Sequence, residues 1–343
     1  NGNGNGNGDG NTSCGPSNGS GQVTQVVGFS QKLVNWANAQ NLTVEFPDES
    51  VSMEKVTLDM TISCPAGGCD PWDRFGNIKV IDEAGEAFEI ARFITPYDIG
   101  GAGPGACSWS YDLTDYQSLL KGDKELSLYI STWIGGDKGW VIDANFSFQE
   151  GQAALEPFRV VNLWNHGHLV YGNPANPHED HLQPVNVDIP DGTVAAAVRV
   201  LTTGHGQGNT DNAAEFSVKE HTIVAGGQSY PWTPWRSDCA QNTCSPQGGS
   251  WTYGRAGWCP GDRVIPHVID VSANLQAGQA LAVDYDIESY ENCCRPDNPS
   301  CNASNGSCCM SFAGECGWNY TGHTEPNFAL GAQLILYRDP CAD

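Results

Sequence analysis

Residues 51–80 read VSMEKVTLDMTISCPAGGCDPWDRFGNIKV, and this stretch decides the fold class that the sequence predicts. Apolar and polar side chains alternate at residues 56–62, which is the pattern of a β-strand with one buried face. Cys64 and Cys69 then enclose a Pro-Ala-Gly-Gly turn, and a Trp-Asp-Arg triplet follows at residues 72–74. A bridge between these cysteines would restrict where the triplet can point, because disulfide geometry tolerates little displacement. We expect the triplet near a strand end. It could form a preorganised functional site, or it could belong to a structural loop in which Asp73 and Arg74 form a surface ion pair.

The same alternation recurs along the chain in short segments separated by Gly, Pro and Asn residues. These segments are 52–62, 124–133, 195–203, 279–288 and 328–337. Short strands without long helices between them are typical of antiparallel β-sandwiches. FSQKLVNWANAQ, residues 29–40, is the one segment with the spacing of a short helix. The sequence therefore predicts an all-β protein.

Changes in composition divide the chain into units. Residues 1–22 are rich in Asn and Gly, can bury no apolar surface, and are expected to form a flexible tail. The stretch EGQAALEPF lies between two strand-like segments and places a domain boundary near residue 154. The expected domains are 23–154 at the N-terminal side and 155–343 at the C-terminal side. Residues 289–327 contain six cysteines among polar residues, which indicates a disulfide-stapled insert between two strands.

Charge and cysteine content exclude several function classes. The 343 residues include 40 acidic residues and 16 Lys plus Arg, so binding to nucleic acid or to anionic lipid is disfavoured. No apolar run approaches the ~20 residues of a membrane span, and the first residues lack the apolar core of a signal peptide. Fourteen cysteines in polar loops indicate disulfides and a secreted or periplasmic protein, with the tail suited to a cell-surface tether. Zinc binding is the alternative, but no pair of C-x-x-C motifs has finger-like spacing.

Several motifs carry a resemblance to a known family. They are CDPWDRFGNIKV at 69–80, EIARFITPY at 89–97, DLTDYQSLL at 112–120, TW at 132–133 and RAGWCPG at 255–261. In these motifs, over most of residues 45–290, the chain resembles the bacterial peptide-N-glycosidase F amidases, which release N-linked glycans from asparagine. The resemblance implies two side-by-side eight-stranded antiparallel jelly-roll β-sandwiches with the active site in the cleft between them. It also implies the bridges Cys64–Cys69 and Cys239–Cys259, no cofactor, a monomer, and N-glycosylated proteins and glycopeptides as substrates.

The resemblance assigns two catalytic carboxyl groups. Asp73, in the Trp-Asp-Arg triplet, matches the primary catalytic aspartate, and Glu215, in DNAAEFSVKEHT, matches a second-domain glutamate that acts through a bridging water. Without the resemblance, Glu215 would be interpreted as a solvated loop acid. Amide hydrolysis needs an activated water, stabilisation of the carbonyl oxygen and a proton for the leaving nitrogen. Arg74 and Arg255 suit charge stabilisation and hydrogen bonds to sugar or amide groups. A short family disulfide around Glu215 is absent, so its loop must be braced in another way.

Substrate contacts are expected to differ from those of the family. Trp72, Trp133 and Trp258 match family tryptophans, and flat indole rings suit the apolar faces of pyranose rings. Ser131 stands where the family's LYxETW strand carries a glutamate, and a hydroxyl cannot serve as a carboxylate at neutral pH. His205 stands where a family tryptophan follows a Thr-Thr pair. We expect Ser131 and His205 to contact the substrate in place of these groups.

Two rival functions remain open from the sequence. His166, His168, His178 and His181 lie close together, and on a strand His166 and His168 would share one face, as a metal chelate requires. The peptidylglycine-hydroxylating copper monooxygenases use the same pair of sandwiches, but their second copper site needs a His-x-His that His221-Thr222-Ile223 does not provide, so no metal is expected. The second rival function is that of a protein that binds glycans without cleaving them, because Ser131 replaces a family glutamate.

Overall fold

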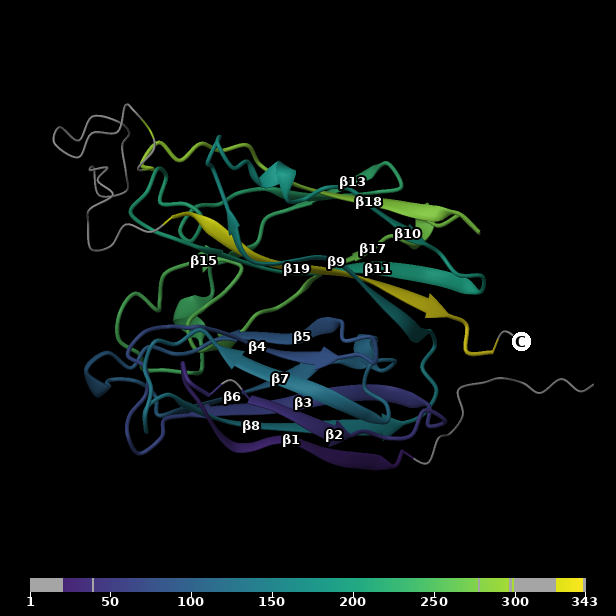
Figure 1. Ribbon diagram of the computed structural model, residues 1–343, viewed down its shortest axis with the longest axis horizontal. Coiled ribbons are helices and arrows are strands. Elements are labelled where there is room, and N and C mark those ends of the chain that lie inside the picture. The colour runs from purple at the N-terminus through teal and green to yellow at the C-terminus, as the bar shows by residue number, and fades with distance from the viewer. Residues whose placement is uncertain (1–20, 39, 277, 296–297, 299–324, 342–343) are drawn as a thin grey trace, which may run out of the picture.

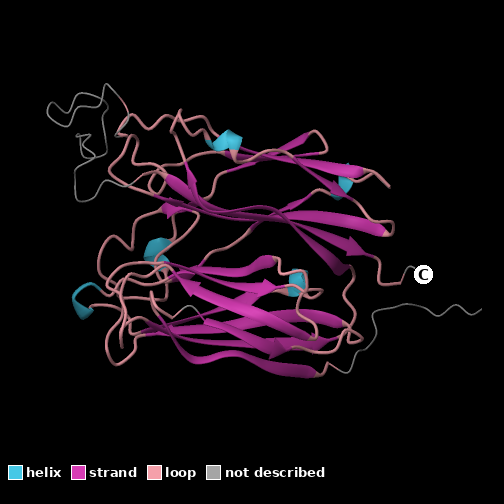
Figure 2. Cartoon of the chain, in the orientation of Figure 1, coloured by secondary structure: helices cyan, strands magenta, loops and turns pink. Residues whose placement is uncertain are grey.

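The structure is a computed structural model that describes residues 21–341 except 39, 277, 296–297 and 299–324. Antiparallel sheets form two sandwiches, which lie over each other as four layers (Figure 1). The described chain is mainly strand and loop (Figure 2), and its helices are short 3₁₀ turns at Ile99–Gly101, Thr114–Tyr116, His178–Asp180, Cys239–Gln241 and Ser272–Asn274. None of the helices in these ranges has the length and apolar composition to span a membrane. The predicted all-β class is confirmed.

The first sandwich consists of the sheets β1-β8-β3-β6 and β16-β5-β4-β7-β2. The strands of its first sheet are β1 (Val23–Val34), β8 (Trp140–Glu150), β3 (Met53–Ser63) and β6 (Ala106–Asp112). Those of its second sheet are β5 (Ala87–Ile94), β4 (Phe75–Ile81), β7 (Asp123–Ile130), β2 (Gln40–Glu45) and β16 (Asp262–Arg263), the last from the second half of the chain. Alternate residues of β3, including Leu58, Met60 and Ile62, are buried between the sheets. The alternation in the opening stretch thus predicted this strand and its buried face.

The second sandwich consists of the sheets β10-β18-β12-β13 and β17-β11-β19-β9. The strands of its outer sheet are β10 (Val185–Asp188), β18 (Ala280–Ile287), β12 (His221–Ala225) and β13 (Gln228–Trp232). Those of its inner sheet are β17 (His267–Asp270), β11 (Thr193–His205), β19 (Asn327–Arg338) and β9 (Glu156–Val170). A small separate sheet pairs β14 (Trp235–Arg236) with β15 (Arg255–Ala256). The predicted pair of antiparallel sandwiches is confirmed: each half of the chain builds one from eight strands, and β16 joins the first as a ninth. The boundary near residue 154, which falls between β8 and β9, stays a prediction.

A buried polar cluster lies where the two sandwiches meet. On β5, Arg92 and Glu89 form an ion pair at 2.7 Å, and both side chains are almost fully buried. Arg92 also donates a hydrogen bond to the carbonyl of Ala329 on β19 at 2.6 Å. Gly331 of β19 passes so close that a Cβ there would lie 3.2 Å from the Glu89 carboxylate. Because a buried charge is costly unless it is fully paired, this cluster restricts how the two sandwiches can dock.

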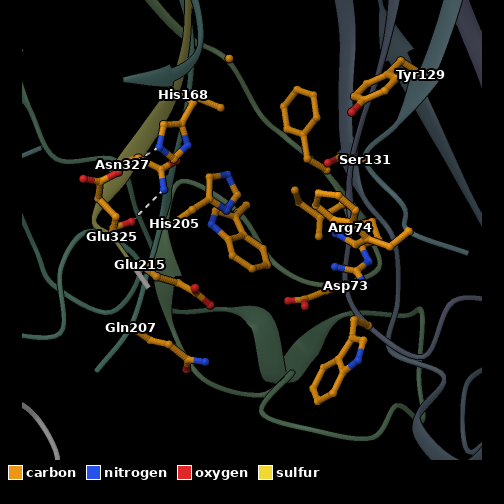
Figure 3. Close-up of a pocket in the computed structure, with 18 residues that line it drawn as sticks. Asp73, Arg74, Tyr129, Ser131, His168, His205, Gln207, Glu215, Glu325 and Asn327 are labelled. Carbon is orange, nitrogen blue, oxygen red and sulfur yellow. Dashed lines mark hydrogen bonds and ion pairs between the residues drawn. The ribbon is translucent and has the colours of Figure 1, made fainter. Parts of the chain in front are cut away.

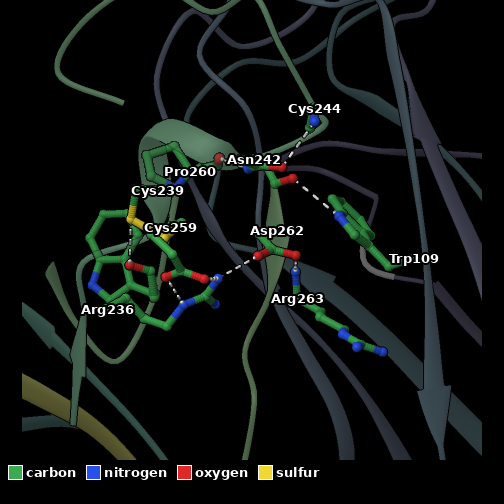
Figure 4. A network of polar contacts seen from close by, with 12 residues as sticks. Trp109, Arg236, Cys239, Asn242, Cys244, Cys259, Pro260, Asp262 and Arg263 are labelled. Carbon is green, nitrogen blue, oxygen red and sulfur yellow. Dashed lines mark hydrogen bonds and ion pairs between the residues drawn. A yellow bond between two sulfur atoms is a disulfide. The ribbon is translucent and has the colours of Figure 1, made fainter. Parts of the chain in front are cut away.

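A segment of the second half crosses to the first sandwich and is fixed there (Figure 4). Cys244 is bonded to Cys107 of β6, across 137 residues of sequence. The short strand β16 pairs with the edge of β5, and the indole N–H of Trp109 donates to the carbonyl of Gly261 at 3.1 Å. Figure 4 also shows Asp262 beside Arg236, at 2.9 Å. Sequence reasoning did not predict this crossing, because the loop carries no periodic pattern.

The cysteines of the described residues are all disulfide-bonded. Both bridges that the resemblance implied, Cys64–Cys69 and Cys239–Cys259, are present. The bridge Cys107–Cys244 was not predicted. Most of the cysteine-rich insert predicted at 289–327, and almost all of the tail predicted at 1–22, lie outside the described residues. The disulfide framework agrees with the interpretation of the cysteine count.

The segment at residues 29–40, whose spacing was compatible with a short helix, instead continues strand β1 and leads into β2. The pairing of β1 with β8 shifts register around Phe29, between Val27 and Lys32. These irregularities place the buried Phe29 and Val34 five residues apart, where a regular strand would bury alternate residues. The interrupted alternation therefore gave a helix-like spacing to a bulged strand.

We expect loss of the Cys107–Cys244 bridge to lower the free energy of unfolding by about 4 kcal/mol, because the bridge closes a long loop in the unfolded chain. The double variant Cys107→Ser/Cys244→Ser would be compared with Cys64→Ser/Cys69→Ser by urea unfolding. The second pair closes a much shorter loop and should cost less. Equal losses in the two variants would contradict a constraint that depends on loop length.

Candidate active site

A cavity of about 840 Å³ lies between the two sandwiches, at one end of both (Figure 3). One wall comes from the loop that leads into β4 and from the residues around the end of β7. The other comes from the ends of β9 and β11, the loop that leads to β12, and the start of β19. The cavity has the volume of a typical small-ligand site. Every residue that the sequence predicted for the site lines this cavity except Arg255.

Asp73 and Glu215 enter from opposite walls, and their carboxyl groups point toward each other (Figure 3). Burial raises the pKa of Glu215 to about 8, and the negative charge of Asp73 adds to this rise. Burial also raises the pKa of Asp73. Two carboxyl groups in such an arrangement titrate as a pair, and near neutral pH the pair holds a proton. The cavity thus contains both an acid and a base.

Arg255 stabilises the ionised forms of both carboxyl groups, and Asp73 has Arg74 and Tyr97 in addition. The positive charges of Arg255 and Arg74 and a hydrogen bond from the Tyr97 hydroxyl all oppose the burial that raises the pKa of Asp73. Tyr97 itself stays protonated, since burial and the nearby Asp73 carboxylate raise its pKa. Tyr97 belongs to the motif EIARFITPY but was not predicted as a site residue, because a tyrosine after a strand carries no chemical signature. We infer that the negative charge of the pair rests mainly on Asp73.

Arg255 is completely buried, and protein groups occupy its donors. Its Nε donates to Glu215 at 3.1 Å, and its Nη1 donates to the carbonyls of Ser250 and Tyr253 at 2.9 Å each. Its Nη2 donates to the Ser250 hydroxyl at 2.8 Å and to the Tyr97 hydroxyl at 3.4 Å. Its donors thus all have protein partners here, and a contact of Arg255 with substrate stays a prediction. A buried guanidinium needs all its donors satisfied, so Arg255 positions Glu215 and Tyr97 and supplies a positive charge.

Asp70 holds the Trp-Asp-Arg triplet in place and was missed by sequence reasoning. It is fully buried, and its carboxylate accepts hydrogen bonds from Arg74 Nε at 2.8 Å and from the Thr132 hydroxyl at 2.6 Å. It also accepts the backbone N–H of Trp72 at 3.0 Å. The ion-pair partner of Arg74 is thus Asp70 and not the adjacent Asp73. In the sequence, only its position four residues before Arg74 could have indicated that Asp70 pairs with this arginine. Arg74 still lines the cavity, so part of its fork is open to a ligand.

The three predicted tryptophans have different surroundings. Trp72 and Trp133 line the cavity and are 52% and 77% exposed, so their rings can contact a sugar. Trp258 also lies at the cavity but is 2% exposed, with Arg255 at 4.9 Å over its ring and His205 stacked at 5.3 Å. Little of the Trp258 ring is exposed, so its role as a sugar platform stays a prediction. In the structure it packs against Arg255 and His205.

His205 and Ser131 lie where the chain departs from the family pattern, and both line the cavity. His205 Nε2 is 2.8 Å from the Thr203 hydroxyl. Burial, followed by the positive charge of Arg92, lowers the pKa of His205 to about 3, so its imidazole is neutral. Ser131 follows β7, and its backbone N–H donates to the carbonyl of Phe75 at 2.8 Å. Their substrate contacts stay predictions.

The histidines of the sequence cluster make separate hydrogen-bond contacts. His168 lines the cavity and lies 3.4 Å from Glu325, whereas His166 contacts the carbonyl of His181 at 3.1 Å. Strand β9 shifts register against β19 between His166 and Leu169, the stretch that contains His168, so simple alternation does not hold there. His166 and His168 therefore have different partners, and the expectation that they bind no metal stays a prediction. In the described residues, the group with metal-like spacing is Cys64, Cys69 and Asp98, where the cysteines are bridged.

The loop that carries Glu215 is braced by hydrogen bonds, as the absence of the family disulfide required. Within the loop, the Asn212 side chain accepts the backbone N–H of Gly208 at 2.8 Å. From outside, the Tyr290 hydroxyl donates to the Thr210 carbonyl at 2.6 Å, and the N–H of Cys293 donates to the Thr210 hydroxyl at 3.0 Å. The start of the cysteine-rich segment therefore supports the second carboxyl group.

Comparison with known proteins gives consistent matches. Residues 174–312 match a family described as Peptide-N-glycosidase F, C terminal. The peptide-N(4)-(N-acetyl-beta-D-glucosaminyl)asparagine amidase F of Elizabethkingia miricola is 30% identical over 261 residues, which are 73% of this chain and 72% of that protein. A solved peptide-N(4)-(N-acetyl-beta-D-glucosaminyl)asparagine amidase is 23% identical, with a TM-score of 0.75 over 94% of this chain and 98% of that chain. PNGase F, a glycosylasparaginase from Flavobacterium meningosepticum, is 24% identical, with a TM-score of 0.73 over 93% and 96%.

We expect the free energy of unfolding to fall as the pH rises from about 5 to about 8. The pKa of Glu215 is about 8 in the folded protein and 4.5 in a solvated chain, so the folded state binds more protons in this window. Urea unfolding at several pH values should show a smaller decline for Glu215→Gln, which cannot titrate. The exposed Glu220→Gln is the matched control and should behave like the unmodified protein. An unchanged pH profile in Glu215→Gln would exclude a raised pKa.

Proposed function

The chain belongs to the peptide-N-glycosidase F family, and we propose that it hydrolyses the amide bond between asparagine and the first N-acetylglucosamine of N-linked glycans. The reaction releases the glycan and leaves aspartate in the peptide. Identity of 30% with amidase F over most of both chains supports this activity. The observation that carries the proposal is the pair of carboxyl groups, Asp73 and Glu215, which face each other from two sandwiches across one cavity.

In the proposed mechanism, the two carboxyl groups divide the proton transfers. Asp73, the more strongly stabilised anion, accepts a proton from the attacking water or orients the linkage. Glu215 holds a proton near neutral pH and supplies it, through a bridging water, to the leaving nitrogen. Arg74 stabilises negative charge that develops on the carbonyl oxygen. Water thus adds across the amide bond, and the released glycosylamine later exchanges its amino group for hydroxyl and loses ammonia.

The walls of the cavity suit a sugar attached to a peptide. Trp72 and Trp133 present exposed indole rings for the apolar faces of pyranose rings. Arg74 offers donors, and the neutral His205 and the Ser131 hydroxyl each offer a donor or an acceptor for sugar hydroxyl or acetamido groups. This mixture of flat apolar faces and polar groups is typical of carbohydrate sites and supports N-glycosylated proteins and glycopeptides as substrates.

We further propose that the protein acts as a monomer in an oxidising compartment outside the cytoplasm. The three disulfides Cys64–Cys69, Cys107–Cys244 and Cys239–Cys259 support an oxidising location. The active-site cavity also takes its walls from a single chain, so a second copy is not needed to complete it. The tether predicted for residues 1–22 stays a prediction.

We expect Asp73→Asn to lower turnover by at least ~10³, because the amide keeps the shape of the side chain but cannot accept a proton. Glycopeptide would be incubated with each variant, and mass spectrometry would follow the conversion of asparagine to aspartate. Asp59→Asn, an exposed aspartate on β3, is the control and should leave turnover unchanged. Undiminished release by Asp73→Asn would contradict the mechanism, and no release by the unmodified protein would favour a protein that binds glycans without cleaving them.

Ser131→Glu tests whether the missing family carboxylate limits this protein. If that acid assisted only sugar placement, kcat/KM on small glycopeptides should change by less than about tenfold. A much larger gain would show that the natural protein is poorly matched to these substrates. A new buried charge can destabilise the cavity, so a thermal melt of the variant would accompany the kinetics.

A further inference from the structure

One strongly exposed tryptophan lies outside the cavity. Trp36 is 69% exposed, in the turn between β1 and β2. The other strongly exposed tryptophans of the described residues, Trp72 and Trp133, both line the cavity. An isolated apolar residue on a surface needs no explanation, but exposed aromatic rings that gather beside a binding site do.

Trp36 is joined to the loop that carries Trp133. The backbone N–H of Trp36 donates to the carbonyl of Ile134 at 3.0 Å. The indole ring also packs against the backbone of Gly135, where a Cβ would lie 2.6 Å from Trp36 Cδ1. Any side chain at residue 135 would displace the ring, so this close approach depends on glycine. The turn that carries Trp36 is thus bonded to the residues directly after Trp133, which itself lines the cavity.

The turn that carries Trp36 is held rigidly. Asn35 is 3% exposed, and its side-chain amide donates to the carbonyls of Gly136 and Lys138 at 3.1 Å each. Its side-chain oxygen accepts the backbone N–H of Ala37 at 3.1 Å. The ring of Trp36 is thus presented in place before any ligand arrives, and binding to it orders little additional chain.

We propose that Trp36 is an outer carbohydrate platform that contacts a sugar of the glycan beyond the residues enclosed in the cavity. This inference rests on the proposed function, because a long glycan whose first sugar lies between Asp73 and Glu215 must extend out of the cavity. An indole face suits a pyranose ring. A peptide is the less suitable occupant, since Asn35 already binds the Gly136 and Lys138 carbonyls that a peptide backbone would use.

Two substrates with the same peptide test this proposal, one with a complete N-glycan and one trimmed to two N-acetylglucosamine residues. For Trp36→Ala, we expect KM for the complete glycan to rise about 3- to 10-fold, the effect of one aromatic contact, while kcat stays unchanged. KM for the trimmed substrate should equal that of the unmodified protein. Trp36→Phe should retain most of the affinity for the complete glycan, and Trp133→Ala should weaken both substrates.

Two outcomes would overturn the platform. If Trp36→Ala left KM for the complete glycan unchanged, Trp36 would not contact the substrate. If KM rose equally for both substrates, Trp36 would act only through the loop of Trp133. Absence of release from either substrate by the unmodified protein would refute the proposed function instead. In that case, calorimetry of the two glycopeptides would test the platform without turnover. We expect Trp36→Ala to bind the glycopeptide with the complete glycan more weakly and the trimmed glycopeptide with unchanged affinity.

Discussion

The buried guanidinium of Arg255 is the constraint on which the rest of the site depends. A cation without contact to water must have its hydrogen bonds and its charge satisfied by protein groups. Arg255 meets this requirement with Glu215, Tyr97 and the turn that contains Ser250 and Tyr253. The same charge limits how far burial raises the pKa values of the two carboxyl groups. One buried residue thus fixes the geometry of the acid and allows its partner to ionise.

This arrangement requires the two sandwiches to be held in a fixed relation. The carboxyl groups come from different sandwiches, so a small rotation of one against the other would separate them. The ion pair of Glu89 and Arg92, with its hydrogen bond to Ala329, is satisfied in one docked arrangement. The disulfide Cys107–Cys244 holds the segment that contains Arg255 against the first sandwich. Long-range contacts of the fold therefore act directly on the chemistry of the cavity.

Residue type alone did not show which aromatic and basic side chains can contact a ligand and which only position their neighbours. Trp133 and Trp258 belong to motifs of equal quality, yet one is among the most exposed tryptophans and the other is buried beneath His205 and Arg255. Arg74 and Arg255 differ in the same way, since only the first lines the cavity. In each pair, burial decides whether a side chain can meet a ligand or can only position its neighbours.

The sequence by itself determined the fold class and the strands with regular alternation, because periodicity is a local property. It also identified Asp73 and Glu215, although only through a family resemblance. Around Phe29 and again near His168 the strands bulge, and the local pattern did not show this, since a bulge changes the period without a signal in residue type. The tertiary structure alone decided which groups lose contact with water, because burial and hydrogen-bond partners come from residues far apart in the chain. For this reason the roles of Arg255, Asp70 and Tyr97, and the proton held between the two carboxyl groups, could not be derived from the sequence.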